Sequence, residues 1–302
     1  MGFLSRFIVS ASLACAGVSA SAADLTFTTV PGAGGLPLNV AETGKADGPA
    51  ILFIHGMAMG YLSFKPQFDS DLAKDFRLVA FDLRGHGNSG KPWKPEDVQP
   101  SDIWADDVAA VIKAKGLTKP VIVGWSYGGF VAADYIRKYG TAGVAGLNLV
   151  GSLAGLVQQP PPVGNMTPDE MKRRAAMQTS GNLLDNLSIV EATTKIFEFP
   201  GMTPEYRAEM HAMGVMVPAY VRRAFVGRNL DHQDVTPKLT LPLLVTMGSN
   251  DIAQAPDAYA RLKAALPKAT YSVFENTGHL PFAQNPARFN KELAEFVRAA
   301  NK

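Results

Sequence analysis

One serine in the sequence has the neighbours that a catalytic nucleophile needs. The segment Gly124-Trp125-Ser126-Tyr127-Gly128 follows the β-branched apolar run 121–123 and precedes a helix-compatible segment, 130–139. Glycines on both sides of the serine permit the sharp, strained turn that projects a hydroxyl between a strand and a helix. The N-terminus of that helix would offer backbone N–H groups to a developing oxyanion. The pattern therefore predicts that Ser126 is a nucleophile.

A serine hydroxyl is a weak nucleophile near neutral pH, so Ser126 needs a base, and the base needs a carboxylate that orients it. The candidate base is His279, the one histidine of five that follows a late predicted strand. The candidate acid is Asp251, in the turn after another late strand. Asp257 is the alternative acid, although it falls inside the next predicted helix.

An oxyanion is stabilised by two backbone N–H groups. Tyr127 directly follows the nucleophile and is predicted to supply one of them. Met57 lies in the loop after the apolar run 50–54 and is predicted to supply the other. Because the backbone does this work, an ordinary methionine side chain is acceptable there. Four more residues are predicted to line the substrate pocket: His55, Met59, Trp125 and Met213.

The elements that must position these groups alternate along most of the chain. Alternating strands and helices predict an α/β fold with a mostly parallel sheet of the eight-stranded type and helices on both faces. The strands are expected at 24–30, 36–43, 50–54, 76–81, 120–124, 144–150, 241–247 and 270–274. The helices are expected at 61–74, 101–115, 130–139, 256–266 and 286–300.

Residues 152–238 interrupt this alternation with helical pieces that contain many methionines. We expect a helical cap inserted over the carboxyl ends of the strands, where open α/β sheets place their sites. The core would then consist of residues 23–151 and 239–302. The cap methionines either fill the space between helices or form an adaptable apolar wall of the pocket.

The first 22 residues differ from the rest of the chain. Arg6 precedes the apolar stretch 7–18, and Ala20-Ser21-Ala22 offers a cleavage site between small residues. These features predict a signal peptide over residues 1–22 and a periplasmic or secreted protein. Cys15 is the only cysteine and would be removed with the signal, so we expect no disulfide.

The amino-acid composition and net charge indicate which kinds of binding partner to expect. The chain has 302 residues, 47% of them hydrophobic, and a net charge of +2, which suits a sizeable globular core and gives no electrostatic reason to expect nucleic acid. No apolar run is long enough to span a bilayer. Neither metal-ligand spacing nor a nucleotide-binding glycine motif occurs, so we expect no metal and no cofactor. The expected partner is a small molecule, and the oligomeric state is left open.

Several of these segments together resemble the α/β-hydrolase fold superfamily: His55-Gly56, 82–89, 124–129, Gly248-x-x-Asp251 and Gly278-His279. The resemblance covers essentially all of residues 23–302 outside the cap. It implies a Ser-His-Asp triad and a structural role for the turn at 82–89. Serine esterases, haloperoxidase-like enzymes and acyl-homoserine lactonases are the most similar branches. Epoxide hydrolases and haloalkane dehalogenases carry an aspartate nucleophile where this sequence has Ser126.

The expected function is that of a serine hydrolase of carboxylesterase or lactonase type, acting on an ester or lactone through an acyl-enzyme. The same triad would also serve an acyl-homoserine lactonase, a C–C bond hydrolase, or a cofactor-free haloperoxidase or perhydrolase. A non-catalytic binding module with this fold is the alternative from another class. It is disfavoured because no member of the triad is missing from the sequence.

Overall fold

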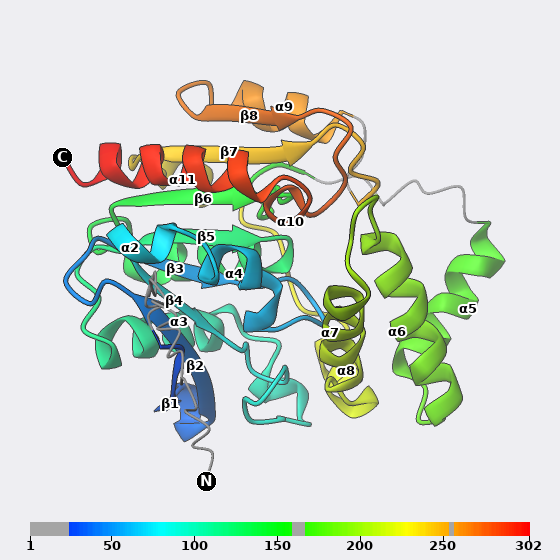
Figure 1. Cartoon of the computed structure of the whole chain (residues 1–302). Helices are drawn as coiled ribbons and strands as arrows, with labels where there is room; N and C mark the ends of the chain where they lie inside the picture. Colours follow the sequence, from blue (N-terminus) through cyan, green and yellow to red (C-terminus); the bar gives the residue numbers. More distant parts are fainter. Residues whose placement is uncertain (1–23, 159–166, 254–256) are drawn as a thin grey trace, which may run out of the picture.

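The computed structural model describes residues 24–158, 167–253 and 257–302, and within them eight strands form a single sheet (Figure 1). The strand order is β1-β2-β4-β3-β5-β6-β7-β8. β2 pairs antiparallel with β1 and β4, and all other neighbours are parallel, which confirms the predicted mostly parallel sheet. The strands are β1 Thr26–Pro31, β2 Pro37–Gly44, β3 Ala50–Ile54, β4 Arg77–Phe81, β5 Val121–Trp125, β6 Gly146–Val150, β7 Leu243–Gly248 and β8 Thr270–Phe274.

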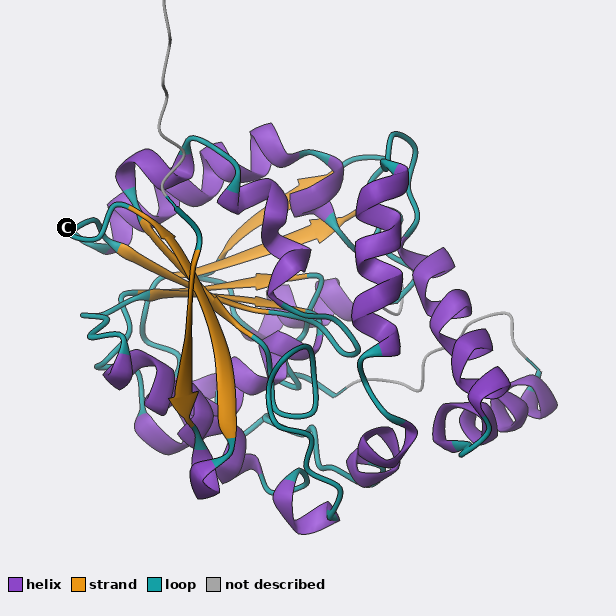
Figure 2. Cartoon of the chain, turned by 60° about the horizontal axis from the view of Figure 1, so that its bottom comes forward, coloured by secondary structure: helices purple, strands orange, loops and turns teal. Residues whose placement is uncertain are grey.

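The central strands are apolar on both sides because helices cover both faces of the sheet. Every residue of β3, β5, β6 and β7 is buried. Figure 2 shows the strands fanning out in the twist that open sheets adopt. One face packs on α3 Ser101–Ala114, α4 Tyr127–Tyr139 and α9 Ala258–Ala265. The other packs on α1 Lys65–Phe68, α2 Leu72–Asp75, α10 Pro281–Gln284 and α11 Pro286–Ala300.

The single helix predicted for residues 61–74 is broken in the structure. A 3₁₀ turn at Tyr61–Phe64 leads into α1, and α2 follows as a separate turn. Ser70 lies at the break, where its hydroxyl donates to the carbonyl of Gln67 at 2.7 Å and accepts the N–H of Leu72 at 3.2 Å. Serine side chains that bond nearby backbone groups compete with continuous helix, which explains the interruption.

Among the described residues, four α-helices lie between β6 and β7 in the chain, and we call them the cap helices. Their bounds are α5 Pro168–Thr179, α6 Leu183–Phe197, α7 Pro204–Val215 and α8 Ala219–Phe225. Three start at side-chain caps, since Thr167, Asn182 and Thr203 accept backbone N–H groups of the first turns. Figure 1 shows the cap helices together beyond one end of the sheet.

A buried polar cluster ties the segment after α8 to α4. The guanidinium of Arg228 bonds the carboxylate of Asp134, and Nε2 of His232 lies 2.7 Å from the same carboxylate. Arg228 also lies over the ring of Trp104, 4.5 Å from its centroid. Because such a cluster is costly unless every charge is paired, these contacts favour one position of the segment on the core.

Residues 1–22, predicted to be a signal peptide, fall outside the described residues, so export remains a prediction. In the described part of the chain, none of the helices has the length and apolar character needed to cross a bilayer.

Candidate active site

Ser126 occupies a strained turn between β5 and α4. Its φ and ψ are 52° and −115°, and a positive φ is costly for a residue with a Cβ atom. Two hydrogen bonds hold the turn: the N–H of Ser126 donates to the carbonyl of Val150 at 2.9 Å, and its carbonyl accepts the hydroxyl of Ser152 at 2.7 Å. The fold therefore maintains the strain that projects the hydroxyl.

The glycines around the turn are required by close backbone contacts. A Cβ atom on Gly128 would lie 2.0 Å from the carbonyl oxygen of Ile54, and one on Gly124 would lie 2.8 Å from the carbonyl oxygen of Gly128. On the opposite loop, a Cβ on Gly56 would lie 3.2 Å from Cβ of Ser126. The start of α4 thus packs directly on the end of β3, and the loop after β3 approaches the serine.

The candidate base and acid are in direct contact. Nδ1 of His279 lies 2.9 Å from Oδ2 and 3.0 Å from Oδ1 of Asp251. The two side chains are 3% and 1% exposed. A carboxylate only accepts, so Nδ1 is the donor in this contact, and Nε2 is the ring nitrogen left to act as a base. Asp257, the alternative acid, is instead exposed and pairs with Arg261 at 3.3 Å.

His279 and Ser126 are brought together around the end of β6. Val150, the last residue of β6, accepts the N–H of Ser126, and a Cβ on the next residue, Gly151, would lie 3.1 Å from Nδ1 of His279. Trp125 donates its indole N–H to the carbonyl of His279 at 3.0 Å. The described contacts include no hydrogen bond from the Ser126 hydroxyl to the imidazole, and in free enzymes this bond is often long until substrate binds.

The cap helix α6 supplies an aromatic wall that the sequence did not point to. Phe197 stacks on the imidazole of His279, with ring centroids 5.7 Å apart and an interplanar angle of 12°. Nothing in the local pattern distinguishes Phe197 from any other apolar residue near the end of a helix. Only the position of α6 over the sheet brings it to the histidine.

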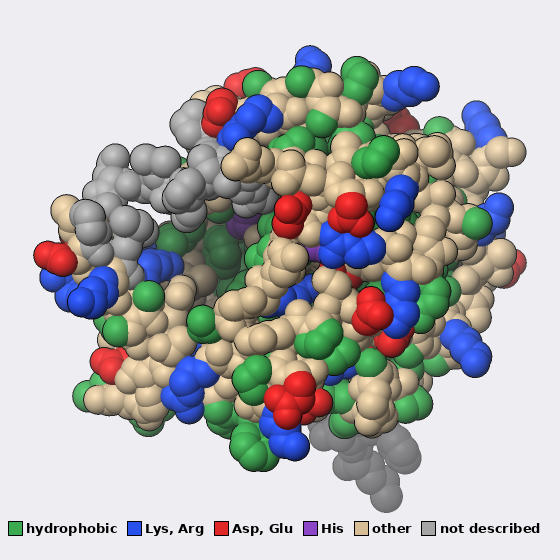
Figure 3. Space-filling view, turned by 180° about the vertical axis from the view of Figure 1, so that it is seen from behind, with side chains coloured by type: hydrophobic (Ala, Val, Ile, Leu, Met, Phe, Trp, Pro, Cys, Tyr) green, Lys and Arg blue, Asp and Glu red, His purple; other side chains and the backbone are tan. Residues whose placement is uncertain are grey.

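A cavity of about 180 Å³ opens at Ser126 between the loop after β3 and the cap helices. Met57 and Met59 line it on the side of the sheet. Figure 3 shows a hollow on this part of the surface, with hydrophobic side chains inside it and a histidine at its edge. From the cap, the lining residues are Arg174, Gln178, Ile189, Val190, Thr193, Thr194, Phe197, Gly214 and Arg222.

Three residues predicted for the pocket lie outside this lining. Trp125 is fully buried beneath the turn, where it bonds His279. His55 is fully buried, its Nδ1 2.7 Å from the carbonyl of Gly56 and its Nε2 accepting the N–H of Leu83 at 2.9 Å. Met213 is buried, and its sulfur accepts the hydroxyl of Ser63 at 3.9 Å.

Tyr127, predicted to provide an oxyanion N–H, is the first residue of α4. The first N–H groups of a helix have no intrahelical carbonyl, so this donor fits the predicted role. Its hydroxyl has another partner: it is bonded by the guanidinium of Arg228. Burial raises the pKa of Tyr127 above its ordinary value, so the phenol stays neutral. The side chain thus anchors the start of α4.

His55 and His86 form a buried neutral pair next to the site. Their ring centroids are 5.2 Å apart, and Nδ1 of His86 bonds the carbonyl of Arg84 while its Nε2 has no partner among the described groups. Burial lowers the pKa of His55 to about 4, and burial with the neighbouring His55 lowers the pKa of His86 to about 3. The nearby ammonium of Lys91 acts in the same direction.

This pair predicts a loss of stability in mild acid. In the unfolded chain both imidazoles bind protons below pH ~6.5, but in the folded protein they stay neutral until about pH 4 or lower. The free energy of unfolding should therefore fall as pH drops from 6.5 to 4, by about 3 kcal/mol for each histidine. Urea denaturation at several pH values measures this slope. The variant His86→Gln should have a shallower slope, and an unchanged slope would contradict the prediction.

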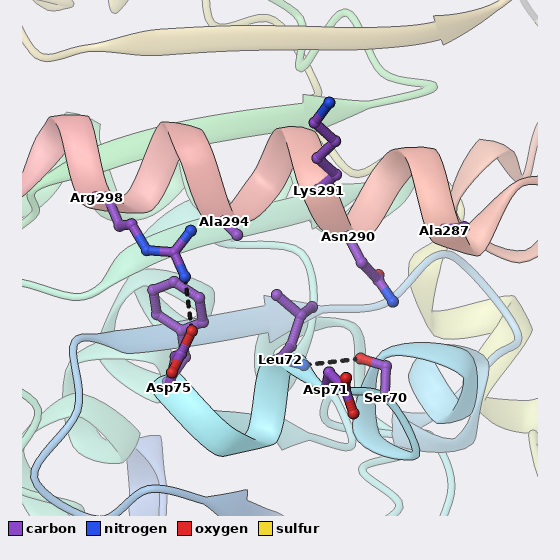
Figure 4. Close-up of a pocket in the computed structure, with 10 residues that line it drawn as sticks. Ser70, Asp71, Leu72, Asp75, Ala287, Asn290, Lys291, Ala294 and Arg298 are labelled. Atoms are coloured by element: carbon purple, nitrogen blue, oxygen red, sulfur yellow. Dashed lines mark hydrogen bonds and ion pairs between the residues drawn. The ribbon is translucent and has the colours of Figure 1, made fainter.

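A second hollow, of about 350 Å³, lies between α2 and α11 (Figure 4). Arg298 crosses it to pair with Asp75 at 2.6 Å. It shares no residue with the cavity at Ser126, and its lining contains no histidine. The hollow therefore lacks the serine, histidine and carboxylate arrangement found around Ser126.

Comparison with known proteins agrees with this geometry. The model of the family described as "Alpha/beta hydrolase family" matches residues 51–292. The chain is 26% identical to the AB hydrolase superfamily protein YisY of Bacillus subtilis, over 82% of this chain and 91% of that protein. It is also 26% identical to the bifunctional esterase/perhydrolase DCH of Acinetobacter calcoaceticus, over 88% and 97%. A putative aryl esterase of Burkholderia cenocepacia superposes with a TM-score of 0.82 at 31% identity, covering 91% of this chain and 99% of that one.

Proposed function

Because the chain belongs to the alpha/beta hydrolase family, we propose that it is a serine hydrolase that cleaves a carboxylic ester or lactone through an acyl-enzyme. The observation that carries the proposal is the buried contact between His279 and Asp251 beside the strained turn of Ser126. Nucleophile, base and orienting carboxylate are the three parts that acyl transfer by serine requires. The similarity to an esterase/perhydrolase and to a putative aryl esterase supports the same chemistry.

The steps of the reaction follow from these positions. Oγ of Ser126 attacks the carbonyl carbon while Nε2 of His279 takes its proton, and Asp251 stabilises the imidazolium. The N–H groups of Met57 and Tyr127 hold the oxyanion, each worth about 10²–10³ in rate. The bond to the leaving alcohol breaks as Nε2 returns the proton to its oxygen. Water then attacks the acyl-enzyme by the same route and releases the acid.

Covalent labelling tests the proposal directly. A fluorophosphonate probe should form a bond to Oγ of Ser126 with loss of fluoride, and mass spectrometry of peptides should locate the adduct on that residue. The unlabelled protein should hydrolyse a short-chain 4-nitrophenyl ester. A folded protein that takes up no probe and releases no 4-nitrophenol would favour the non-catalytic binding module instead.

The similarity to a bifunctional esterase/perhydrolase supports a second reaction of the same acyl-enzyme. Hydrogen peroxide would replace water in the second step and release a peroxy acid. In lactone opening and C–C bond hydrolysis Ser126 would again attack a carbonyl carbon, but the bond that breaks is the ring C–O bond or a C–C bond, and the proton from His279 goes to oxygen or to carbon. Product analysis with esters, acyl-homoserine lactones and vinylogous diketones, with and without peroxide, separates these reactions.

A further inference from the structure

The cavity at Ser126 contains an excess of positive charge. Of its lining residues, two from the cap carry a guanidinium, Arg174 on α5 and Arg222 on α8. Within the described residues, no aspartate or glutamate lines it. The rest of the cap lining is apolar or neutral, so nothing in the lining balances the two charges. Figure 3 shows a Lys or Arg side chain beside the hollow.

Arg222 is tied to the cap by neutral oxygens. Its Nε donates to the carbonyl of Gln178 at 2.8 Å, and its terminal nitrogens bond the carbonyl of Val217 and the side-chain oxygen of Asn186. These bonds fix the guanidinium between α5, α6 and α8 without neutralising it. Burial, with a smaller contribution from Arg223, lowers its pKa, but an arginine still remains protonated at neutral pH.

Arg174 has no such partners. It is half-buried in the cavity wall, and within the described residues no hydrogen bond or ion pair engages its guanidinium. Arg288, another partly buried arginine, is paired with Glu292 at 2.7 Å. A guanidinium presents its donors in a planar fork that matches a carboxylate. Within the described residues, Arg174 is therefore an unpaired guanidinium in the lining of the cavity that contains Ser126, where it can bind an anion.

We propose that the substrate is a short ester that carries a carboxylate besides the bond that is cleaved, and that Arg174 binds this carboxylate. This inference rests on the proposed hydrolase function and specifies its substrate class. The charge of Arg222 in the same lining adds to the attraction, and the small cavity favours a short acyl group. A charge-assisted hydrogen bond of this kind is worth about ten- to a hundred-fold in binding.

A matched pair of esters tests the substrate class. Mono-(4-nitrophenyl) glutarate and 4-nitrophenyl pentanoate have acyl chains of equal length, but only the first carries a carboxylate. The ratio of their kcat/KM values should favour the glutarate in the native protein and fall at least ten-fold in Arg174→Met, mainly through KM. Arg174→Lys should retain part of the preference for the glutarate, because lysine keeps the positive charge. High salt should lower the ratio in the native protein, because it screens the charge.

Arg173→Met is the control, since Arg173 lies on the same helix but is exposed and outside the cavity lining. In Arg173→Met the ratio of kcat/KM for the glutarate to kcat/KM for the pentanoate should equal that of the native protein. Equal ratios in native protein and Arg174→Met would overturn the anion site while ester hydrolysis itself still stood.

Binding to an inactive variant separates this proposal from the hydrolase proposal. Monomethyl glutarate should bind Ser126→Ala in calorimetry, and the double variant Ser126→Ala with Arg174→Met should bind it at least ten-fold more weakly. This result would support the anion site even if neither chromogenic ester were turned over. If Ser126→Ala does not bind monomethyl glutarate more tightly than the double variant does, the anion site is refuted.

Discussion

Ser126→Ala is expected to lower kcat for a 4-nitrophenyl ester by about 10⁴- to 10⁶-fold, since removal of a serine nucleophile leaves only the oxyanion donors and substrate binding. The other hydroxyls in the cavity lining, those of Thr193 and Thr194, donate to carbonyls of their own helix, at 2.8 and 2.9 Å. Stopped assays with purified protein measure the residual rate.

A second variant, Ser126→Gly, shows whether the loss of activity reflects a loss of folding. Ser126→Gly removes the Cβ atom that makes a φ of 52° costly, so it should be at least as stable as the native protein to heat and equally inactive. Turnover of the ester by either folded variant at more than a hundredth of the native rate would refute Ser126 as the nucleophile.

Asp251→Asn should cost about 10³- to 10⁴-fold in kcat with little change in KM. The carboxylate now meets Nδ1 of His279 with both oxygens, at 2.9 and 3.0 Å. An amide there bears no charge to stabilise the imidazolium, and its NH₂ group can hold the ring in the wrong tautomer. Initial rates over a range of substrate concentrations separate the two kinetic constants.

The matched control is Asp257→Asn, six positions later in the chain. Asp257 is the alternative acid, but its side chain is 66% exposed and pairs with Arg261 from the N-cap position of α9. An exposed ion pair of this kind contributes little to stability, and none of the described contacts joins Asp257 to His279, so Asp257→Asn should keep the native kcat and KM. If Asp257→Asn proved slow and Asp251→Asn normal, the acid would have been assigned to the wrong residue.

The sequence predicted correctly those features that depend on residues close together in the chain. The run 121–123 followed by Gly124-Trp125-Ser126-Tyr127-Gly128 was enough to predict strand, turn and helix, because the turn tolerates no Cβ atom on either flanking glycine. β3 and α11 begin and end at the predicted residues. The contact between Asp251 and His279 follows from the same principle: each comes directly after a parallel strand, and such strands end at one edge of the sheet.

Local sequence patterns gave a wrong prediction where a side chain forms hydrogen bonds with nearby backbone groups. Residues 61–74 have the composition of one helix, yet the hydroxyl of Ser70 bonds two backbone groups and interrupts it. The burial of His55 is a similar case. Its sequence position next to the site suggested a pocket residue, but both ring nitrogens are bonded to backbone groups under the loop.

The sequence by itself therefore determined the sheet, the strained serine and the candidates for its two partners, since these depend on periodicity, glycine positions and strand ends. Tertiary structure alone decided what surrounds the serine. Helical periodicity predicts which cap residues share a face, but not which face meets the cavity. That choice depends on long-range contacts such as Arg228 with Asp134, which hold the cap segment on the core so that Phe197 and Arg174, rather than Met213, line the site.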